Sequence, residues 1–199
     1  MALPIAHATA GFLIHRLDGR RTRFHGWPRA LTYMAIANCP DADFLIGFAL
    51  GAPGLYHRGV SHTLVAAIAF GAVAALISRA VVRDRWWPAA VAFGSVYASH
   101  LLVDALTIDA RPPIGAAFFW PFSDAYFGAP VTLFHEILID GKSRLGFVDS
   151  ILQWRTAAVL GRELAIAGIV TVGVLAMQGV WRVVGARRAA LPVREEDLA

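Results

Sequence analysis

Three long stretches of the sequence carry no charged residue. Residues 59–78, 86–103 and 164–181 contain 20, 18 and 18 residues without an Asp, Glu, Lys or Arg. A helix that crosses a membrane needs about 20 predominantly apolar residues, within a range of roughly 17–25. Because a backbone in hydrocarbon must satisfy its own hydrogen bonds, helix is the expected conformation of such stretches. The sequence therefore predicts three membrane-spanning helices.

The composition agrees with a membrane protein. Hydrophobic residues make up 57% of the chain and charged residues only 16%, whereas soluble domains average roughly 45–50% and about 25%. This balance excludes intrinsic disorder, which requires low hydrophobicity and high charge, and it disfavours an ordinary soluble enzyme. The single cysteine, Cys39, excludes an intrachain disulfide and a cysteine-based zinc finger.

Five helical segments are expected in all. Residues 2–14 and 30–40 are also apolar, although they are shorter than a membrane span. A cleavable secretory signal begins with a basic region, and no basic residue precedes Arg16. We therefore expect residues 2–17 to be a retained helix; the alternative is an amphipathic helix buried in a soluble core. The predicted fold is all-α, an integral membrane helical bundle that forms a single domain over residues 1–199.

The other segments connect or extend this bundle. Segments 64–82 and 86–106 are expected to form an antiparallel pair joined by a tight turn. Residues 107–158 are predicted to be an irregular, aromatic-rich insert, and residues 185–199 a polar tail. Small residues in the spanning segments would allow close helix contact; they are Gly71, Ala74, Ala75, Gly94, Gly168 and Gly173.

The basic residues predict a topology. The chain has 18 Lys and Arg against 14 Asp and Glu, and they follow no recognisable nucleic-acid-binding module, so no nucleic-acid partner is expected. Basic residues accumulate on the cytoplasmic side of membrane proteins. We predict a multi-pass protein of a bacterial inner membrane with its C-terminus in the cytoplasm and residues 107–158 on the outer face. If the five segments alternate in direction, twelve basic residues meet at the cytoplasmic end: Arg16, Arg20, Arg21, Arg23, Arg29, Arg79, Arg83, Arg85, Arg182, Arg187, Arg188 and Arg194.

Histidines and carboxylates gather at the opposite end. Ionisable residues in spanning segments are costly, and they indicate a functional site by default. Nitrogen and oxygen donors together suit Zn²⁺, Mn²⁺ or Fe, so we predict a metal site there. The candidate ligands are His7, Asp41, Asp43, His57, His62, His100, Asp104 and Glu163.

Local spacing supports some of these ligands more than others. His100 and Asp104 are four residues apart and share one helix face. The alternatives are a hydrogen-bonded structural histidine, an Asp41-x-Asp43 turn, and a Glu163 that pairs with Arg162 or Arg155. Gly59 would permit a turn between His57 and His62, and Ser61 would cap the helix that follows.

The order of these motifs resembles a known family. His7, then PDAD (40–43), HRGVSHT (57–63), SHLLVD (99–104) and FWPF (119–122) are similar to the YdjM-like family of membrane-bound metal-dependent hydrolases, described as LexA-binding and associated with the inner membrane. The resemblance covers residues 1–125 and, more loosely, Glu163.

The motifs are also distantly similar to the helical zinc-dependent phospholipase C and single-strand nuclease group, which acts on phosphodiesters. That likeness implies ligation by Asp41 or Asp43, His62, His100, Asp104 and Glu163. The further histidine ligands of that group have no match after Asp104.

These observations predict a metal-dependent hydrolase. Two ions, with one or three as alternatives, would be held by Asp41, Asp43, His57, His62, His100 and Asp104, and would activate water. Zinc is the expected metal, with manganese or iron as alternatives. Asp43 or Glu163 would orient that water. Arg58 would bind an anionic head group, or else form a salt bridge with an aspartate.

The expected substrate is a membrane lipid with a phosphate ester or phosphodiester, whose chain the aromatic insert would hold. The alternatives are a non-catalytic membrane protein that is stabilised by metal, a scaffold for a protein partner, and a transporter. A transporter would need polar residues along the whole depth of the membrane.

Overall fold

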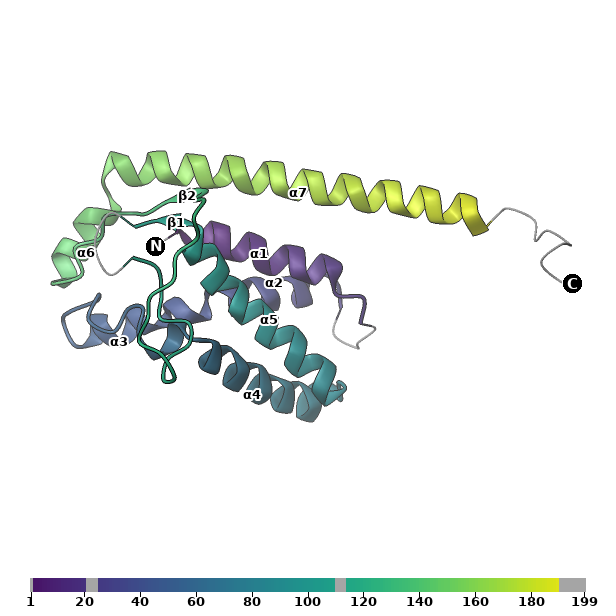
Figure 1. Ribbon diagram of the computed structural model, residues 1–199, viewed down its shortest axis with the longest axis horizontal. Coiled ribbons are helices and arrows are strands. Elements are labelled where there is room, and N and C mark those ends of the chain that lie inside the picture. Colours follow the sequence, from purple (N-terminus) through teal and green to yellow (C-terminus); the bar gives the residue numbers. More distant parts are fainter. Residues whose placement is uncertain (1, 21–24, 110–113, 190–199) are drawn as a thin grey trace, which may run out of the picture.

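The computed structural model describes residues 2–20, 25–109 and 114–189 (Figure 1). Within them the chain is mainly helical, which confirms the all-α class. Of the twelve basic residues assigned to the cytoplasmic end, Arg21, Arg23 and Arg194 lie outside the described residues. In chain order the elements are α1 (Pro4–Leu17), α2 (Gly26–Asn38), the 3-10 helix η1 (Cys39–Ala42), α3 (Asp43–Ala49), the 3-10 helix η2 (Val60–His62), α4 (Leu64–Val82), α5 (Trp86–Ala105), β1 (Thr107–Ile108), β2 (Phe134–His135), α6 (Arg144–Ile151) and α7 (Trp154–Ala189).

Helices α4 and α5 form the predicted antiparallel pair. Helix α4 begins after Thr63, whose hydroxyl accepts a hydrogen bond from the Ala66 N–H at 3.1 Å, and it ends at Arg83 in the left-handed conformation. The two helices approach closely at Gly71 and Gly94, because a β-carbon on Gly71 would lie 2.6 Å from the Ala90 carbonyl oxygen. Gly71 and Gly94 therefore allow the close contact between helices that the sequence predicted.

Helix α5 is the centre of the bundle. It packs against α4, α2 and α1, and its Phe93, Val96, Tyr97 and Leu101 join Tyr33 of α2 in the hydrophobic core. Among the described residues, two helices are long and apolar enough to cross a membrane: α4, and α7 from Trp154 to Val184. The predicted span 86–103 does not qualify, because the polar residues of α5 reduce its hydropathy.

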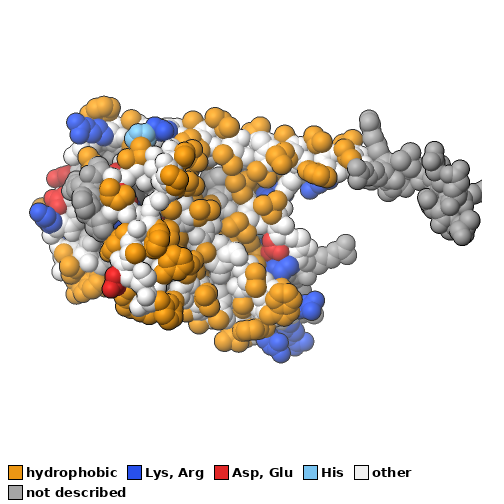
Figure 2. Space-filling model, viewed as in Figure 1, with side chains coloured by type: hydrophobic (Ala, Val, Ile, Leu, Met, Phe, Trp, Pro, Cys, Tyr) orange, Lys and Arg blue, Asp and Glu red, His pale blue; other side chains and the backbone are white. Residues whose placement is uncertain are grey.

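Helix α7 lies beside α1 and extends past it (Figure 1). The two helices run in the same direction, since Glu163 contacts the start of α1 and Gln178 hydrogen-bonds Arg16 near its end. A β-carbon added to Gly168 or Gly173 would meet no atom of another described segment within 4 Å, so neither glycine makes a close helix contact within the described part of the chain. Figure 2 shows hydrophobic side chains along much of the visible surface of α7.

The insert is more ordered than the sequence predicted. Strands β1 and β2 pair in parallel, with Thr107 opposite Phe134. Helix α6 follows, and α7 already begins at Trp154, inside the segment that was expected to be irregular. Backbone hydrogen bonds from Leu64 N to Phe118 O and from Ala129 N to Ala105 O, both 2.9 Å, attach the insert to the ends of α4 and α5. These ends also carry the candidate site.

Candidate metal centre

Four of the predicted ligands meet at the end of the bundle. The Nε2 atoms of His62 and His100 lie 3.2 Å apart. Asp41 Oδ1 is 3.6 Å from His62 Nε2 and 3.4 Å from His100 Nε2, and Asp104 Oδ2 is 3.6 and 3.5 Å from the same two atoms. Donor atoms on one tetrahedral ion at about 2.0–2.1 Å are separated by about 3.3–3.4 Å. The measured separations therefore suit shared metal ligands.

Hydrogen bonds fix the orientation of both imidazoles. His100 Nδ1 lies 2.8 Å from the Ala37 carbonyl oxygen, which can only accept, so this nitrogen carries the proton. His62 Nδ1 faces the Ser61 hydroxyl at 3.0 Å and Asp43 Oδ2 at 3.3 Å. Partners of this kind at one ring nitrogen leave the lone pair of a neutral histidine on the other. The Nε2 lone pairs of His62 and His100 therefore converge, as ligands of a cation require.

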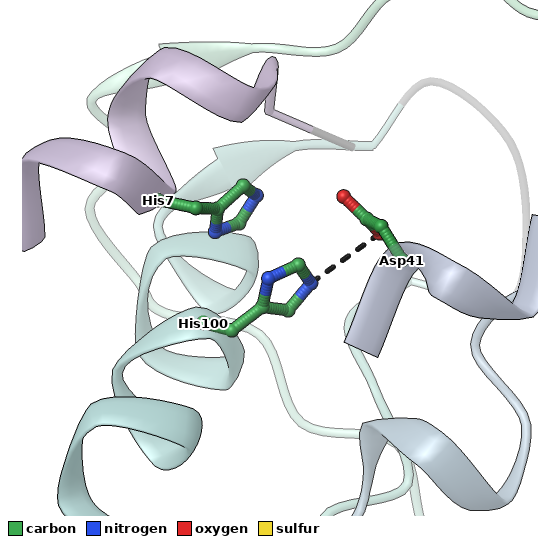
Figure 3. A group of neighbouring side chains, drawn as sticks. All are labelled: His7, Asp41 and His100. Carbon is green, nitrogen blue, oxygen red and sulfur yellow. Dashed lines mark ion pairs between the residues drawn. The ribbon is translucent and has the colours of Figure 1, made fainter. Parts of the chain in front are cut away.

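His7 belongs to the same cluster. Its ring stacks on that of His100 with centroids 3.7 Å apart, and its Nε2 lies 3.7 Å from Asp104 Oδ1. Figure 3 shows His7 on α1 and His100 on α5 next to each other, with Asp41 facing them from η1. His7 and His100 are fully buried.

Buried polar atoms that lack a hydrogen-bond partner test whether a metal ion fits this cluster. Within the described part of the chain, both nitrogens of His7 and both oxygens of Asp41 and Asp104 are buried without a hydrogen-bond partner. Buried polar atoms are almost always paired, and a cation held among these atoms would satisfy the carboxylate oxygens and a histidine lone pair. Three overlapping groups of His and Asp residues lie close enough together to hold an ion. The donor set fits a divalent transition metal.

Asp43 and His57 lie at the edge of this cluster. Asp43 Oδ1 is 3.2 Å from His57 Nδ1, and its Oδ2 accepts a hydrogen bond from Ser61 Oγ at 2.8 Å. Although burial opposes ionisation, hydrogen bonds with His57 and His62 lower the pKa of Asp43 to about 2. Burial lowers the pKa of His57, which favours its neutral form. Asp43 is thus a carboxylate that orients two imidazoles through their Nδ1 atoms.

The structure places Glu163 outside the groups that could hold metal. Its side chain is fully buried, and its two oxygens accept hydrogen bonds from the backbone N–H groups of Leu3 at 2.5 Å and Ala6 at 3.2 Å. A carboxylate at a helix N-terminus satisfies free N–H groups and the helix dipole. Glu163 therefore anchors the first turn of α1, which carries His7.

Arg58 forms the salt bridge that the sequence left as an alternative. Its guanidinium donates two hydrogen bonds to Asp109, at 2.8 and 2.6 Å, and a longer one to the Gly115 carbonyl. In the turn expected at Gly59, the left-handed conformation belongs to Arg58 (φ 61°), whereas Gly59 has φ −82°. Ser61 does not cap α4, because Thr63 does so and the Ser61 hydroxyl is committed to Asp43.

A pocket of about 580 Å³ lies beside the cluster. One wall comes from residues 52–58 and the other from residues 136–142, and the Gly54 N–H joins these walls through a 2.9 Å hydrogen bond to the Gly141 carbonyl. Phe44, which stacks on His57 with centroids 4.1 Å apart, is part of the lining. The lining also includes Leu55, His57, Arg58, Glu136, Ile137, Leu138, Ile139 and Lys142.

The sequence did not single out Lys142, Phe44 or Asp109 as site residues. The one local indication that Phe44 belongs to the site was its position directly after Asp43. Lys142 and Asp109 belong to the insert, and no spacing rule connects them to His57 or Arg58. They reach the site only because the insert folds back on the loop before η2.

Similarity to known proteins agrees with this geometry. Residues 1–184 match the family described as YdjM inner membrane protein. The chain belongs to this family. The YdjM match confirms the resemblance drawn from the motifs, and it supports a location in the inner membrane. Comparisons with the curated proteins and with the solved structures found no match.

Proposed function

We propose that this YdjM family member is a membrane-bound metal-dependent hydrolase that acts on a phosphate ester or phosphodiester of a lipid. The observation that carries the proposal is the buried convergence of His62 Nε2, His100 Nε2, Asp41 and Asp104, with carboxylate oxygens unpaired within the described residues, beside a mainly apolar pocket. A divalent ion held by these residues would polarise a phosphoryl oxygen and activate a water molecule. Zinc suits the donors best, and manganese or iron would also fit.

The protein's own residues would prepare the site for this chemistry. Ala37 O and Asp43 hold the two imidazoles with Nε2 inward. Asp43 orients His57 at the pocket. Removing such outer partners of ligating histidines usually weakens metal binding by about 10–100-fold. Asp43 therefore acts in the proposal as a positioning residue and not as the group that touches water.

The pocket lining suggests an amphiphilic substrate. Phe44, Leu55 and Ile137 offer an apolar surface to a hydrocarbon chain. The Lys142 ammonium, in the same lining, would attract an anionic head group, whereas the charge of Arg58 is already balanced by Asp109. A lipid phosphate combines both properties.

A direct assay tests the function. The detergent-purified chain, loaded with Zn²⁺, would be given vesicles that contain phosphatidic acid or a prenyl phosphate, and phosphate or phosphorylated head group would be measured. We expect release by the wild type and loss to background in Asp104→Asn. His135→Asn, a matched change of a polar residue outside the metal-binding groups, should retain the activity. Zinc-loaded protein that leaves every lipid phosphate and phosphodiester intact would refute the proposal.

One observation favours a second candidate, a metal site that only stabilises the fold. His7, His62 and His100 are fully buried, and structural metal sites take four protein ligands and leave no open position for water. In that case chelation would lower the melting temperature, and the protein would hydrolyse no lipid. The same zinc-loaded sample therefore distinguishes the two functions.

A further inference from the structure

The cluster contains more buried ligand atoms than one ion uses. His62, His100 and Asp104 make one compact group, with separations of 3.2–3.6 Å. A single ion bound by this group and Asp41 Oδ1 leaves both His7 nitrogens, Asp41 Oδ2 and His57 Nε2 buried and unpaired within the described residues. Because unpaired buried polar atoms are destabilising, the one-ion arrangement leaves much of the site unexplained.

If the ligands are divided between two ions, each of the four histidines in the cluster is used once. His7 lies with Asp41 and His100 in one group, and His57 lies with Asp41 and His62 in another; in each group the ligand atoms are within 4.8 Å of one another. The two groups share only Asp41. A neutral imidazole has one N–H and one nitrogen lone pair, so each histidine serves one ion.

We propose that the centre holds two divalent ions, one bound by His7 and His100 and the other by His57 and His62, with Asp41 shared between them. Figure 3 draws the first of these groups. The inference rests on the metal centre of the proposed function, and it assigns ligands that a one-ion site would not need. Both oxygens of Asp41 are unpaired, as a bridging carboxylate requires.

Asp104 lies between the two positions. Its Oδ1 is 3.7 Å from His7 Nε2, and its Oδ2 is 3.5 Å from His100 Nε2 and 3.6 Å from His62 Nε2. Two divalent ions against the carboxylates of Asp41 and Asp104 leave a net positive charge, which suits an anionic substrate. Paired ions that stabilise the oxygens of a displacement recur in phosphatases and nucleases.

Counting bound metal tests the inference without an activity assay. The full chain would be loaded with Zn²⁺ in detergent, freed of excess metal and measured for zinc per chain. We expect two ions in the wild type and one in His7→Phe or His57→Phe, because phenylalanine keeps a ring and removes the ligand. His15→Phe changes a histidine on the same helix as His7 but outside the groups, and it should keep two.

The one-ion site on His62, His100 and Asp104 predicts one zinc in the wild type and no change in either phenylalanine variant, and either result would overturn the inference. If either variant fails to fold, a measurement on the wild type alone still tests the inference. Manganese-loaded protein should give the electron paramagnetic resonance spectrum of an exchange-coupled pair, and a spectrum of isolated Mn²⁺ would contradict the shared Asp41. One ion with lipid hydrolysis intact refutes only this inference, whereas two ions without hydrolysis refute only the proposed function.

Discussion

At the residue scale, the chemistry depends on which atom of each side chain faces the cluster. His62 and His100 both present Nε2, because Asp43 and the Ala37 carbonyl occupy their Nδ1 sides. Asp41 and Asp43 are two residues apart but have different surroundings: Asp41 has unpaired oxygens, and Asp43 accepts from Ser61 and faces two histidines. The same residue type therefore serves as ligand in one position and as support in the other.

This difference predicts the outcome of Asp43→Asn. The amide cannot hold both Nδ1–H groups as a carboxylate does, so the affinity for Zn²⁺ should fall by about 10–100-fold without loss of the site. Competition titration against a chelating dye would measure the dissociation constant. Asp149→Asn, at an exposed position of α6, should change nothing. A complete loss of zinc in Asp43→Asn would make Asp43 a ligand instead.

Another carboxylate, Asp18, stabilises the end of the bundle that lies opposite the candidate metal centre. It accepts hydrogen bonds from Arg20, Arg29 and Tyr33, and Arg20 also pairs with Asp84 at 3.2 Å. Burial opposes ionisation of Asp18, but the hydrogen bonds from Tyr33 and Arg20 outweigh it and lower its pKa below the usual 3.8. The network ties the α1–α2 connection to the α4–α5 turn.

The lowered pKa of Asp18 has a defined consequence for stability. A group whose pKa is lower in the folded state contributes its full stabilisation above the unfolded value, and this stabilisation is lost as the pH falls through the folded value. The difference in melting temperature between wild type and Asp18→Asn should therefore be largest above pH 3.8 and shrink below it. Melting curves from about pH 6 to about pH 3 would show this. A difference that stays constant over that range would contradict the role of Asp18.

At the element scale, close helix contact decides which small residues matter. Gly71 lets α4 approach α5, since a β-carbon there would lie 2.6 Å from Ala90 O and 2.8 Å from Gly94 Cα. A β-carbon on Gly168 of α7 would meet no atom of another segment within 4 Å among the residues that the structure describes. The same residue type is therefore essential to packing in one helix and open to the surroundings in the other.

The same substitution should have opposite effects at these two positions. Gly71→Ala should lower the free energy of unfolding by about 1–3 kcal/mol through overpacking. Gly168→Ala should leave it unchanged or raise it by up to about 1 kcal/mol, because alanine is the better helix former. Unfolding in mixed micelles with increasing dodecyl sulfate would compare them. Equal destabilisation by both changes would show that α7 has a close partner on that face.

At the scale of the whole molecule, charge and aromatic side chains mark two ends. All six tryptophans are at least 39% exposed. Trp27, Trp86 and Trp87 begin helices at the basic end, and Trp181 follows Gln178 of α7 near that end. Trp120 and Trp154 belong to the site end. Tryptophan prefers the interface between membrane and water, so the two groups bracket the apolar surfaces of α4 and α7.

This arrangement supports a proposed orientation with the basic end in the cytoplasm. In a Cys39→Ser background, a cysteine at Asp124 should react with a membrane-impermeant thiol reagent on spheroplasts. A cysteine at Arg85 should react only after the membrane is opened. Both positions are exposed, so access to the reagent is the one difference between them. The reverse pattern of labelling would invert the orientation and put the site on the cytoplasmic side.

Sequence alone determined the features that depend on local pattern. Hydropathy located α4, α5 and the apolar part of α7, because a helix of this kind is specified by its own residues. Alternation of helix direction was enough to bring His7, Asp41, His62, His100 and Asp104 to one end. The motifs were enough to indicate the family.

Only the tertiary structure decided how these residues are used. Glu163 anchors α1, Arg58 pairs with Asp109, and α5 is buried by α1, α2 and α4. Each outcome depends on contacts between segments far apart in the chain, and no local pattern records them. Hydrogen-bond direction and burial are properties of a packed neighbourhood, so the assignment of each donor atom had to wait for the fold.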